Sequence, residues 1–129
     1  MDLLKLIALD EEDLSVISAH LQDAVIRVSD IAYIPETNRF VFAARRQDRL
    51  AGTQSCYSGV HFDRVSAVRL RHIDRADGDA ILTLIGIIFE PEDVPSGKAT
   101  FLFKDDKSIQ IDIECIEVHL RDFPMTETV

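Results

Sequence analysis

Apolar positions along the chain follow two spacings, and the change from one to the other predicts a helix followed by strands. Residues 3–9 are mostly apolar and are typical of a short strand. Asp10 then stands where a helix N-cap is expected, and the acidic residues at 11–13 suit the positive end of a helix dipole. Apolar residues follow at three- and four-residue intervals, which predicts a helix over residues 11–23. Its predicted buried face consists of Leu14, Ile17, Leu21 and Ala24, with Val16 beside it.

Beyond this helix, apolar and polar residues alternate with a period of two, which is typical of strands. Residues 24–33 change parity near Ser29, so we predict a bulge or kink there. The turn residues of Pro35–Arg39 lead into a return strand that begins at Phe40, and the two strands form a predicted hairpin. Residues 45–59 show no clean period and are interpreted as a surface loop.

Four further strands are expected in the remainder of the chain. Residues 60–72 alternate and predict one half-buried strand, bent near residues 64–66. Residues 81–89 are apolar on both parities, which is typical of a central strand covered on both faces. Two more alternating strands follow at residues 98–104 and 109–113.

The tail, "CIEVHLRDF" from Cys115 to Phe123, fits two structures. As a strand it needs another change of parity after Cys115. As a helix it places Cys115, His119 and Phe123 on one face, with Pro124 ending it, and we favour this helix. The predicted fold is therefore a single α+β domain over residues 1–129, with a curved, mostly antiparallel sheet of about seven strands, one main N-terminal helix and a short C-terminal helix. The strand order is left open.

Composition predicts a cytoplasmic protein that does not cross a membrane. The chain has 129 residues and a formal net charge of −9, and its N-terminus carries acids where a signal peptide has basic residues. Cys56 and Cys115 are therefore expected to stay reduced, without a disulfide. The longest apolar run, Ala80–Phe89, has about half the length that a membrane-spanning helix needs.

Arginine is concentrated in the middle of this acidic chain. Residues 39–75 include eight arginines and three aspartates. On a regular strand Arg69 and Arg71 project from one face about 6–7 Å apart, and adjacent guanidinium groups suit a phosphate or the carboxylates of a partner. The predicted binding surface consists of Arg69, Arg71 and His61, extended by Arg45 and Arg46. For the basic segment as a whole, the favoured interpretation is that it pairs with the acidic remainder of its own fold, and the binding surface is the alternative.

No motif for catalysis or for a cofactor is present. The sequence lacks a nucleophile motif, a zinc-protease motif and a phosphate-binding glycine loop, so no catalytic residue is predicted and an enzyme is disfavoured. Cys115 and His119 have a spacing that metal sites use, but two ligands on an apolar face are too few, and no metal or cofactor is predicted. Acidic clusters at 74–79, 90–93 and 105–106 are interpreted as solvated turns. Nucleic acid is disfavoured as a partner because the net charge repels a polyanion.

Four blocks of the sequence are similar to a known family. They are "LKLIALDEEDLSVISAHLQDAV" (4–25), "DIAYIPETNRFVFAARR" (30–46), "GVHFDRVSAVRLRHID" (59–74) and "ECIEVHLRDF" (114–123). On these blocks the chain resembles the domain-of-unknown-function family numbered 2948, which is found mainly in alphaproteobacteria. The resemblance implies a cytoplasmic bacterial protein and brings no established activity.

The patterns together favour a non-enzymatic module that self-associates or binds a protein partner, because packing signals run through the whole chain and catalytic motifs are absent. The alternative is a domain that binds a small ligand or an anion through the arginine-bearing strand.

Overall fold

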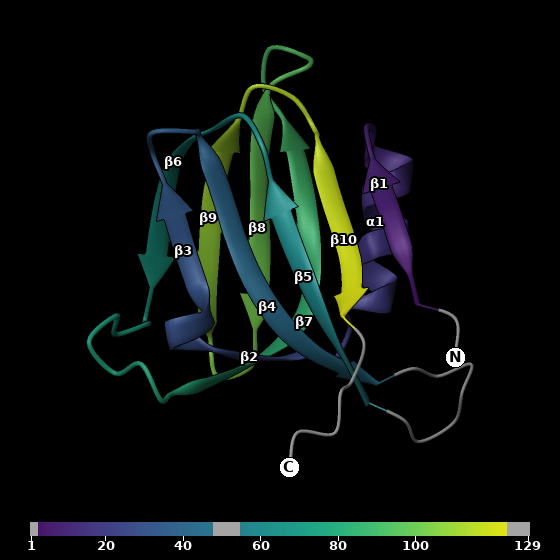
Figure 1. Ribbon diagram of the computed structural model, residues 1–129. Coiled ribbons are helices and arrows are strands. Elements are labelled where there is room, and N and C mark those ends of the chain that lie inside the picture. The colour runs from purple at the N-terminus through teal and green to yellow at the C-terminus, as the bar shows by residue number, and fades with distance from the viewer. Residues whose placement is uncertain (1–2, 48–54, 124–129) are drawn as a thin grey trace.

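The computed structural model describes residues 3–47 and 55–123. These residues form ten strands, one α-helix and one short 3-10 helix (Figure 1). In chain order the elements are β1 (Lys5–Ala8), α1 (Glu11–His20), β2 (Val25–Arg27), η1 (Val28–Asp30), β3 (Ile31–Ile34), β4 (Arg39–Gln47), β5 (Ser55–Phe62), β6 (Val65–Arg71), β7 (Ile81–Pro91), β8 (Gly97–Phe103), β9 (Lys107–Ile113) and β10 (Val118–Phe123).

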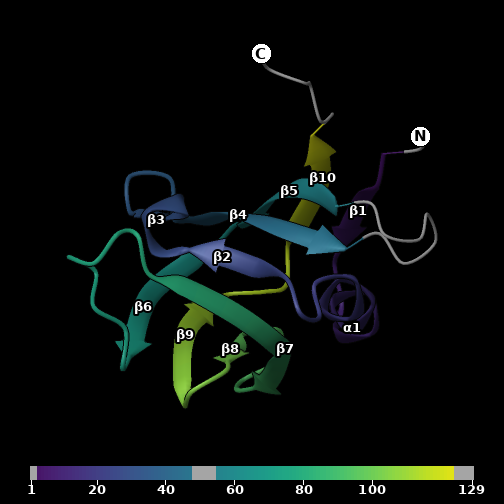
Figure 2. The ribbon, with the colours of Figure 1, turned by 90° about the horizontal axis from the view of Figure 1, so that it is seen from below.

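The strands pair antiparallel throughout, and one path of hydrogen bonds connects nine of them. The order along this path is β1-β10-β5-β4-β2-β7-β8-β9-β6, and β3 pairs with the start of β4. The short strand β2 bonds to β4 on one side and to β7 on the other, so the sheet turns back on itself there. Seen from below, β3, β4, β5, β10 and β1 form one half of the sheet, and β7, β8, β9 and β6 form the half that faces it (Figure 2).

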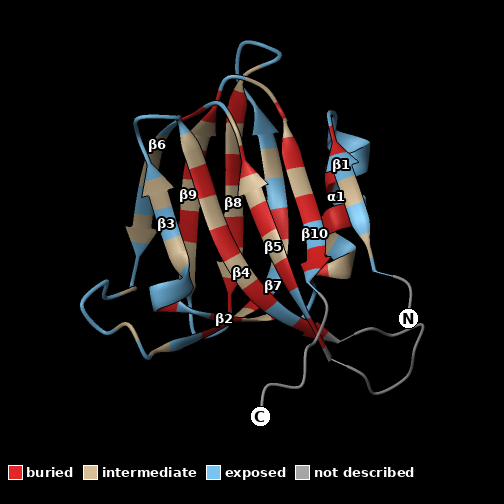
Figure 3. Cartoon of the chain, viewed as in Figure 1, coloured by how far each residue is buried: buried red, intermediate tan, exposed pale blue. Residues whose placement is uncertain are grey.

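The hydrophobic core fills the space between the two halves. Buried and more exposed residues alternate along most strands, so that one face of each half points inward (Figure 3). At the centre, Phe101 of β8 contacts three phenylalanines of the opposite half, with ring centroids 5.2–5.7 Å apart. These three are Phe40, Phe42 and Phe62. We call the four rings the aromatic core; it joins the two halves through side-chain packing.

Helix α1 begins and packs as the sequence predicts. The Asp10 side chain accepts a hydrogen bond of 2.8 Å from the backbone N–H of Asp13, which is the expected N-cap. Leu14 and Ile17 are buried, and the helix packs against β1 and β7. It ends at His20, earlier than the predicted residue 23.

The predicted C-terminal helix is wrong, because residues 118–123 form strand β10. This strand lies between β1 and β5 and pairs with both. Its buried residues alternate, with Val118, Leu120 and Asp122 facing inward. Backbone hydrogen bonds to two neighbouring strands, combined with burial at period two, outweigh the helical pattern that the tail shows in isolation.

Two splits, of the predicted strands at 24–33 and 60–72, join β10 in raising the strand count from the predicted seven to ten. The parity change near Ser29 is a complete break, because η1 separates β2 from β3. The predicted loop at 45–59 includes the end of β4 and the start of β5, while residues 48–54 lie outside the described residues. The predicted bent strand at 60–72 is two strands, since a turn at Arg64, with a left-handed φ of 61°, separates β5 from β6.

The prediction that β7 is covered on both faces is also wrong. Leu82 and Leu84 are buried, but Ile85 and Ile88 on the other face are 50% and 49% exposed. Strand β7 is therefore apolar on both faces, although one of these faces is exposed to solvent.

Within residues 3–47 and 55–123, Cys56 and Cys115 are not joined by a disulfide. No helix in these ranges is long and apolar enough to cross a membrane.

Candidate functional site

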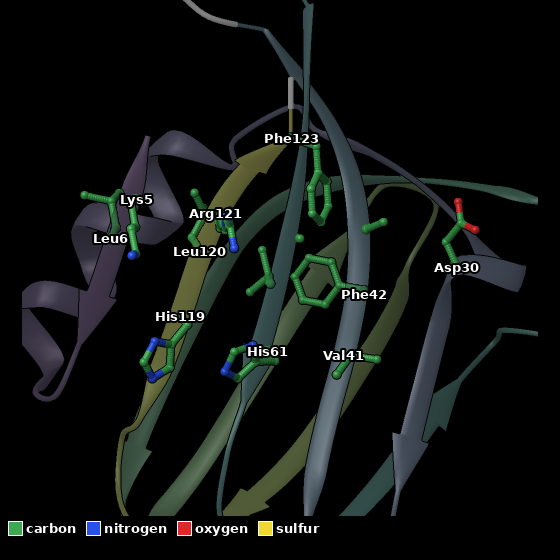
Figure 4. Close-up of a pocket in the computed structure, with 13 residues that line it drawn as sticks. Lys5, Leu6, Asp30, Val41, Phe42, His61, His119, Leu120, Arg121 and Phe123 are labelled. Carbon is green, nitrogen blue, oxygen red and sulfur yellow. The ribbon is translucent and has the colours of Figure 1, made fainter. Parts of the chain in front are cut away.

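A hollow lies on the outer face of the half-sheet formed by β1, β10, β5 and β4 (Figure 4). Strand register places two rows of residues across this face: His119, His61 and Val41 in one row, and Arg121, Gly59 and Ala43 in the next. The small residues of β4 and β5 leave a volume of about 550 Å³. Lys5 of β1 and Phe123 of β10 complete its walls. We call this site the outer hollow.

Two basic side chains border the outer hollow without an acidic partner. Lys5 and Arg121 stand directly opposite each other in the β1–β10 pairing, and both are exposed. Among the described residues, neither takes part in an ion pair. Among the described lining residues only Asp30 is acidic, and Figure 4 places it on the opposite side of the hollow. Lys5 and Arg121 therefore form a local surplus of positive charge on a chain whose net charge is −9.

Phe123 supplies a flat apolar wall to the outer hollow. Its ring lies over Gly59, where an added Cβ would stand only 2.8 Å from a ring carbon. Glycine at this position therefore allows the ring to rest directly on the β5 backbone. Phe123 is still 47% exposed, so part of its ring surface is available to a ligand.

Two histidines and an aspartate gather at one end of the outer hollow. The rings of His61 and His119 stack with centroids 4.6 Å apart and an interplanar angle of 19°. Asp63 places Oδ2 3.7 Å from Nε2 of His61, while its Oδ1 accepts a hydrogen bond of 2.7 Å from Nε of Arg39. We call these three residues the His–Asp cluster.

The charges of the His–Asp cluster follow from burial and from Arg39. Partial burial, reinforced by the nearby guanidinium of Arg39, lowers the pKa of His61, so its imidazole is neutral at neutral pH. Burial alone would raise the pKa of Asp63. The hydrogen bond from Arg39, together with Glu117, the charge of Arg39 and His61, outweighs that effect and holds the pKa below its ordinary value.

Comparison with known families agrees with the resemblance seen in the sequence. The family described as Protein of unknown function (DUF2948) matches residues 4–128. The chain belongs to this family. No curated protein and no solved structure matches it. The family description names no activity, so the function of this DUF2948 protein has to be argued from its geometry.

The DUF2948 structure separates the predicted site residues into four places. Arg69 and Arg71 lie on β6, in the half-sheet opposite the outer hollow. Arg69 donates two hydrogen bonds to the carboxylate of Asp112, at 2.9 and 2.7 Å, and Arg71 lies 3.6 Å from Asp106. Both contacts pair an arginine with an acid of its own fold.

Of the other three predicted residues, only His61 lines the outer hollow. Arg45 lies on β4, where its guanidinium stands 5.8 Å from the ring centroid of Tyr57. Arg46 is buried, with 2% of its side chain exposed, and pairs with the equally buried Asp122. Arg46 is therefore part of the interior of this DUF2948 protein and is closed to a ligand.

Sequence reasoning missed most of the outer hollow. Lys5, Arg121 and Phe123 were not predicted as site residues, and His119 was considered only with Cys115 on a helix. Interpreting the tail as a strand would have placed His119, Arg121 and Phe123 on one face, because strand side chains alternate. The signal was therefore present, but it depended on the alternative that we did not favour.

A second hollow lies at the open seam between β3 and β6. Its volume is about 450 Å³, and its lining is mostly apolar, including Ile31, Val68 and Leu70. The Tyr33 hydroxyl donates a hydrogen bond of 3.0 Å to the Val65 carbonyl across this seam. The outer hollow is the stronger candidate for a functional site because it gathers cations and imidazoles around one space.

Proposed function

We propose that this protein binds a small organic anion in the outer hollow. The observation that carries the proposal is the pair Lys5 and Arg121, which face each other across β1 and β10 with no acidic partner among the described residues. Ammonium and guanidinium groups that are not neutralised by their own fold are available to a phosphate or a carboxylate. The composition favours a cytoplasmic setting for this binding.

The other walls favour an anion that also carries a flat apolar group. Phe123 presents exposed ring surface, and Val41, Ala43 and Gly59 form a floor without charge. His61 is neutral at neutral pH and can donate or accept a hydrogen bond there. Ligand pockets commonly combine an apolar surface with a few convergent polar groups, and the outer hollow has this character.

Phenyl phosphate is expected to stabilise the protein in a thermal-shift titration, and to do so at lower concentration than inorganic phosphate. The phosphate would contact Lys5 and Arg121, while the phenyl ring would stack on Phe123. Each hydrogen bond to a charged group contributes about 1.5–3 kcal/mol, so the double variant Lys5→Ala, Arg121→Ala should bind about a hundredfold more weakly. Isothermal titration calorimetry measures this ratio.

The matched control is the double variant Arg69→Ala, Arg71→Ala, which removes two cations from the opposite half-sheet. It should bind phenyl phosphate as the unmodified protein does. If this control loses binding while the Lys5 and Arg121 variant retains it, the arginine-bearing strand β6 is the anion site and our proposal is wrong. Absence of stabilisation by either phosphate compound also contradicts it.

Self-association is the second candidate function, and the outer face of β7 favours it. Ile85 and Ile88 are each about half exposed there, in the same half-sheet as β6, which carries the ion-paired Arg69 and Arg71. Exposed apolar residues rimmed by polar ones are typical of protein interfaces.

If that face forms a dimer, light scattering at micromolar concentration should give twice the monomer mass. The double variant Ile85→Lys, Ile88→Lys should then be monomeric, because burying two charges is costly. Val94→Lys, at an 82% exposed loop position, is the control and should leave the mass unchanged. A monomeric unmodified protein contradicts this second candidate.

A further inference from the structure

We propose that His61, His119 and Asp63 bind a divalent transition-metal ion such as Zn²⁺ at the end of the outer hollow. The three residues offer one ligand atom each, and these atoms all lie within 4.8 Å of one another. They come from two neighbouring strands: His61 on β5 is directly opposite His119 on β10, and Asp63 follows β5 immediately. The proposal goes beyond anion binding, because neither Lys5 nor Arg121 is among the ligands.

The observed distances are close to those of a metal centre. Zinc lies about 2.0–2.2 Å from imidazole nitrogens and carboxylate oxygens, so two ligand atoms of a tetrahedral site are about 3.4 Å apart. Nε2 of His61 and Oδ2 of Asp63 are already 3.7 Å apart. The remaining separations are at most 4.8 Å, so they need to shorten by at most about 1.4 Å, and the two stacked imidazole rings need to tilt towards one point. Side-chain rotations provide both changes, because all three residues are only partly buried.

Arg39 prepares the carboxylate for coordination and does not block it. It bonds Oδ1 of Asp63 and leaves Oδ2 facing the histidines. An outer partner that holds one oxygen fixes the orientation of the other, as in many metal sites. The backbone carbonyl of Glu117 accepts a hydrogen bond of 2.9 Å from the Asp63 N–H. The Glu117 carboxylate, 3.9 Å from Nε of Arg64, adds a second negative charge nearby.

The neutral form of His61 also suits a metal ion. Imidazole binds a metal only in its neutral form, and burial together with Arg39 lowers the pKa of His61. Three protein ligands leave a further position open, and the outer hollow lies beside it. Sites with three protein ligands and one open position are the kind that hold water or a small anion on the metal.

The test is a titration of chelator-treated protein with Zn²⁺ by calorimetry and with Co²⁺ by visible absorption. We expect one ion per chain, and for Co²⁺ the absorption bands of a low-coordinate site with nitrogen ligands. Loss of an outer-shell partner costs about 10- to 100-fold in metal affinity, so loss of a ligand in His61→Gln or His119→Gln should cost about a hundredfold or more. Circular dichroism of the metal-free variants checks that each remains folded.

His72→Gln is the matched control. His72 also has a ring nitrogen 3.7 Å from a carboxylate oxygen, that of Asp106, but no second histidine belongs to this pair. The control should bind metal as the unmodified protein does, and so should Lys5→Ala, Arg121→Ala, which removes the proposed anion site. The proposal is overturned if no ion binds, or if folded His61→Gln and His119→Gln bind Zn²⁺ unchanged.

Discussion

Replacing Arg46 by methionine is expected to lower the free energy of unfolding by about 3–5 kcal/mol, because it leaves a buried carboxylate without its counter-ion. Arg46 and Asp122 expose only 2% and 1% of their side chains. Nε of Arg46 donates to Ser58 at 3.0 Å and to Asp122 at 3.2 Å, and the Ser58 hydroxyl donates to Asp122 at 2.6 Å. The Leu4 N–H donates a further bond of 2.9 Å to Asp122, so the network ties three strands to the N-terminal segment.

The double variant Arg46→Met, Asp122→Asn should recover most of this loss. It contains no buried charge, and the asparagine can still accept from the Leu4 N–H and donate to Ser58. Replacing a whole buried ion pair by neutral groups is often close to neutral in stability, whereas removing one partner is not. Urea unfolding of both variants measures the difference, and a double variant no more stable than Arg46→Met contradicts this account.

The effect of Arg46→Met should also depend on pH. Burial raises the pKa of Asp122, but hydrogen bonds from Arg46, Ser58 and Leu4 outweigh it and hold the pKa below its ordinary value of 3.8. The pair therefore stabilises the folded protein above that value, and this contribution is lost as pH falls through the folded pKa. In the variant, the buried carboxylate becomes easier to protonate. The stability difference should be greatest above about pH 5 and shrink towards pH 3.

The control is the double variant Arg69→Met, Asp112→Asn, which removes an ion pair of similar geometry from the surface. Here 52% and 27% of the two side chains are exposed. Solvent-exposed pairs contribute about 0–1 kcal/mol, so urea unfolding should change little. A comparable loss in this variant would mean that burial is not what makes the Arg46 pair important.

Local sequence patterns predicted the elements whose structure depends on nearby residues. The Asp10 cap and the buried Leu14 and Ile17 place α1 correctly, because capping and helical periodicity are local properties. The antiparallel strands from residue 81 to residue 113 also follow their alternation. The tail did not, since His119 and Phe123 fit one face of a helix and equally one face of a strand, and only pairing with β1 and β5 decides between them.

The candidate site was harder to predict because its parts are brought together by strand register. Lys5 meets Arg121 only because β1 pairs with β10, and His119 meets His61 only because β10 pairs with β5. The residues near each of these side chains in the sequence do not indicate which distant residue it faces. The arginine-rich stretch illustrates the converse: Arg69 stood out by composition, yet Asp112, which neutralises it, lies on a strand more than forty residues away.

Truncating Phe101 to alanine is expected to lower the free energy of unfolding by about 3–5 kcal/mol, as large-to-small changes at buried aromatic residues do. Phe101 is 1% exposed, and its ring contacts the other three rings of the aromatic core, which belong to the opposite half-sheet. The short strand β2 is where the two halves are joined by strand pairing, because it bonds to β4 in one half and to β7 in the other. Few other contacts between the halves can therefore compensate for the loss of the Phe101 ring.

Phe123→Ala separates this packing effect from ligand binding. Phe123 is also an aromatic residue on a strand, but it is 47% exposed and contacts Gly59 on the outer face. Surface substitutions usually change stability by about 0.5 kcal/mol or less, so its urea midpoint should stay near that of the unmodified protein. Phenyl phosphate binding should weaken, because the stacking surface is gone. Equal destabilisation by the two alanine variants would show that the core does not lie between the half-sheets as described, since only Phe101 lies there.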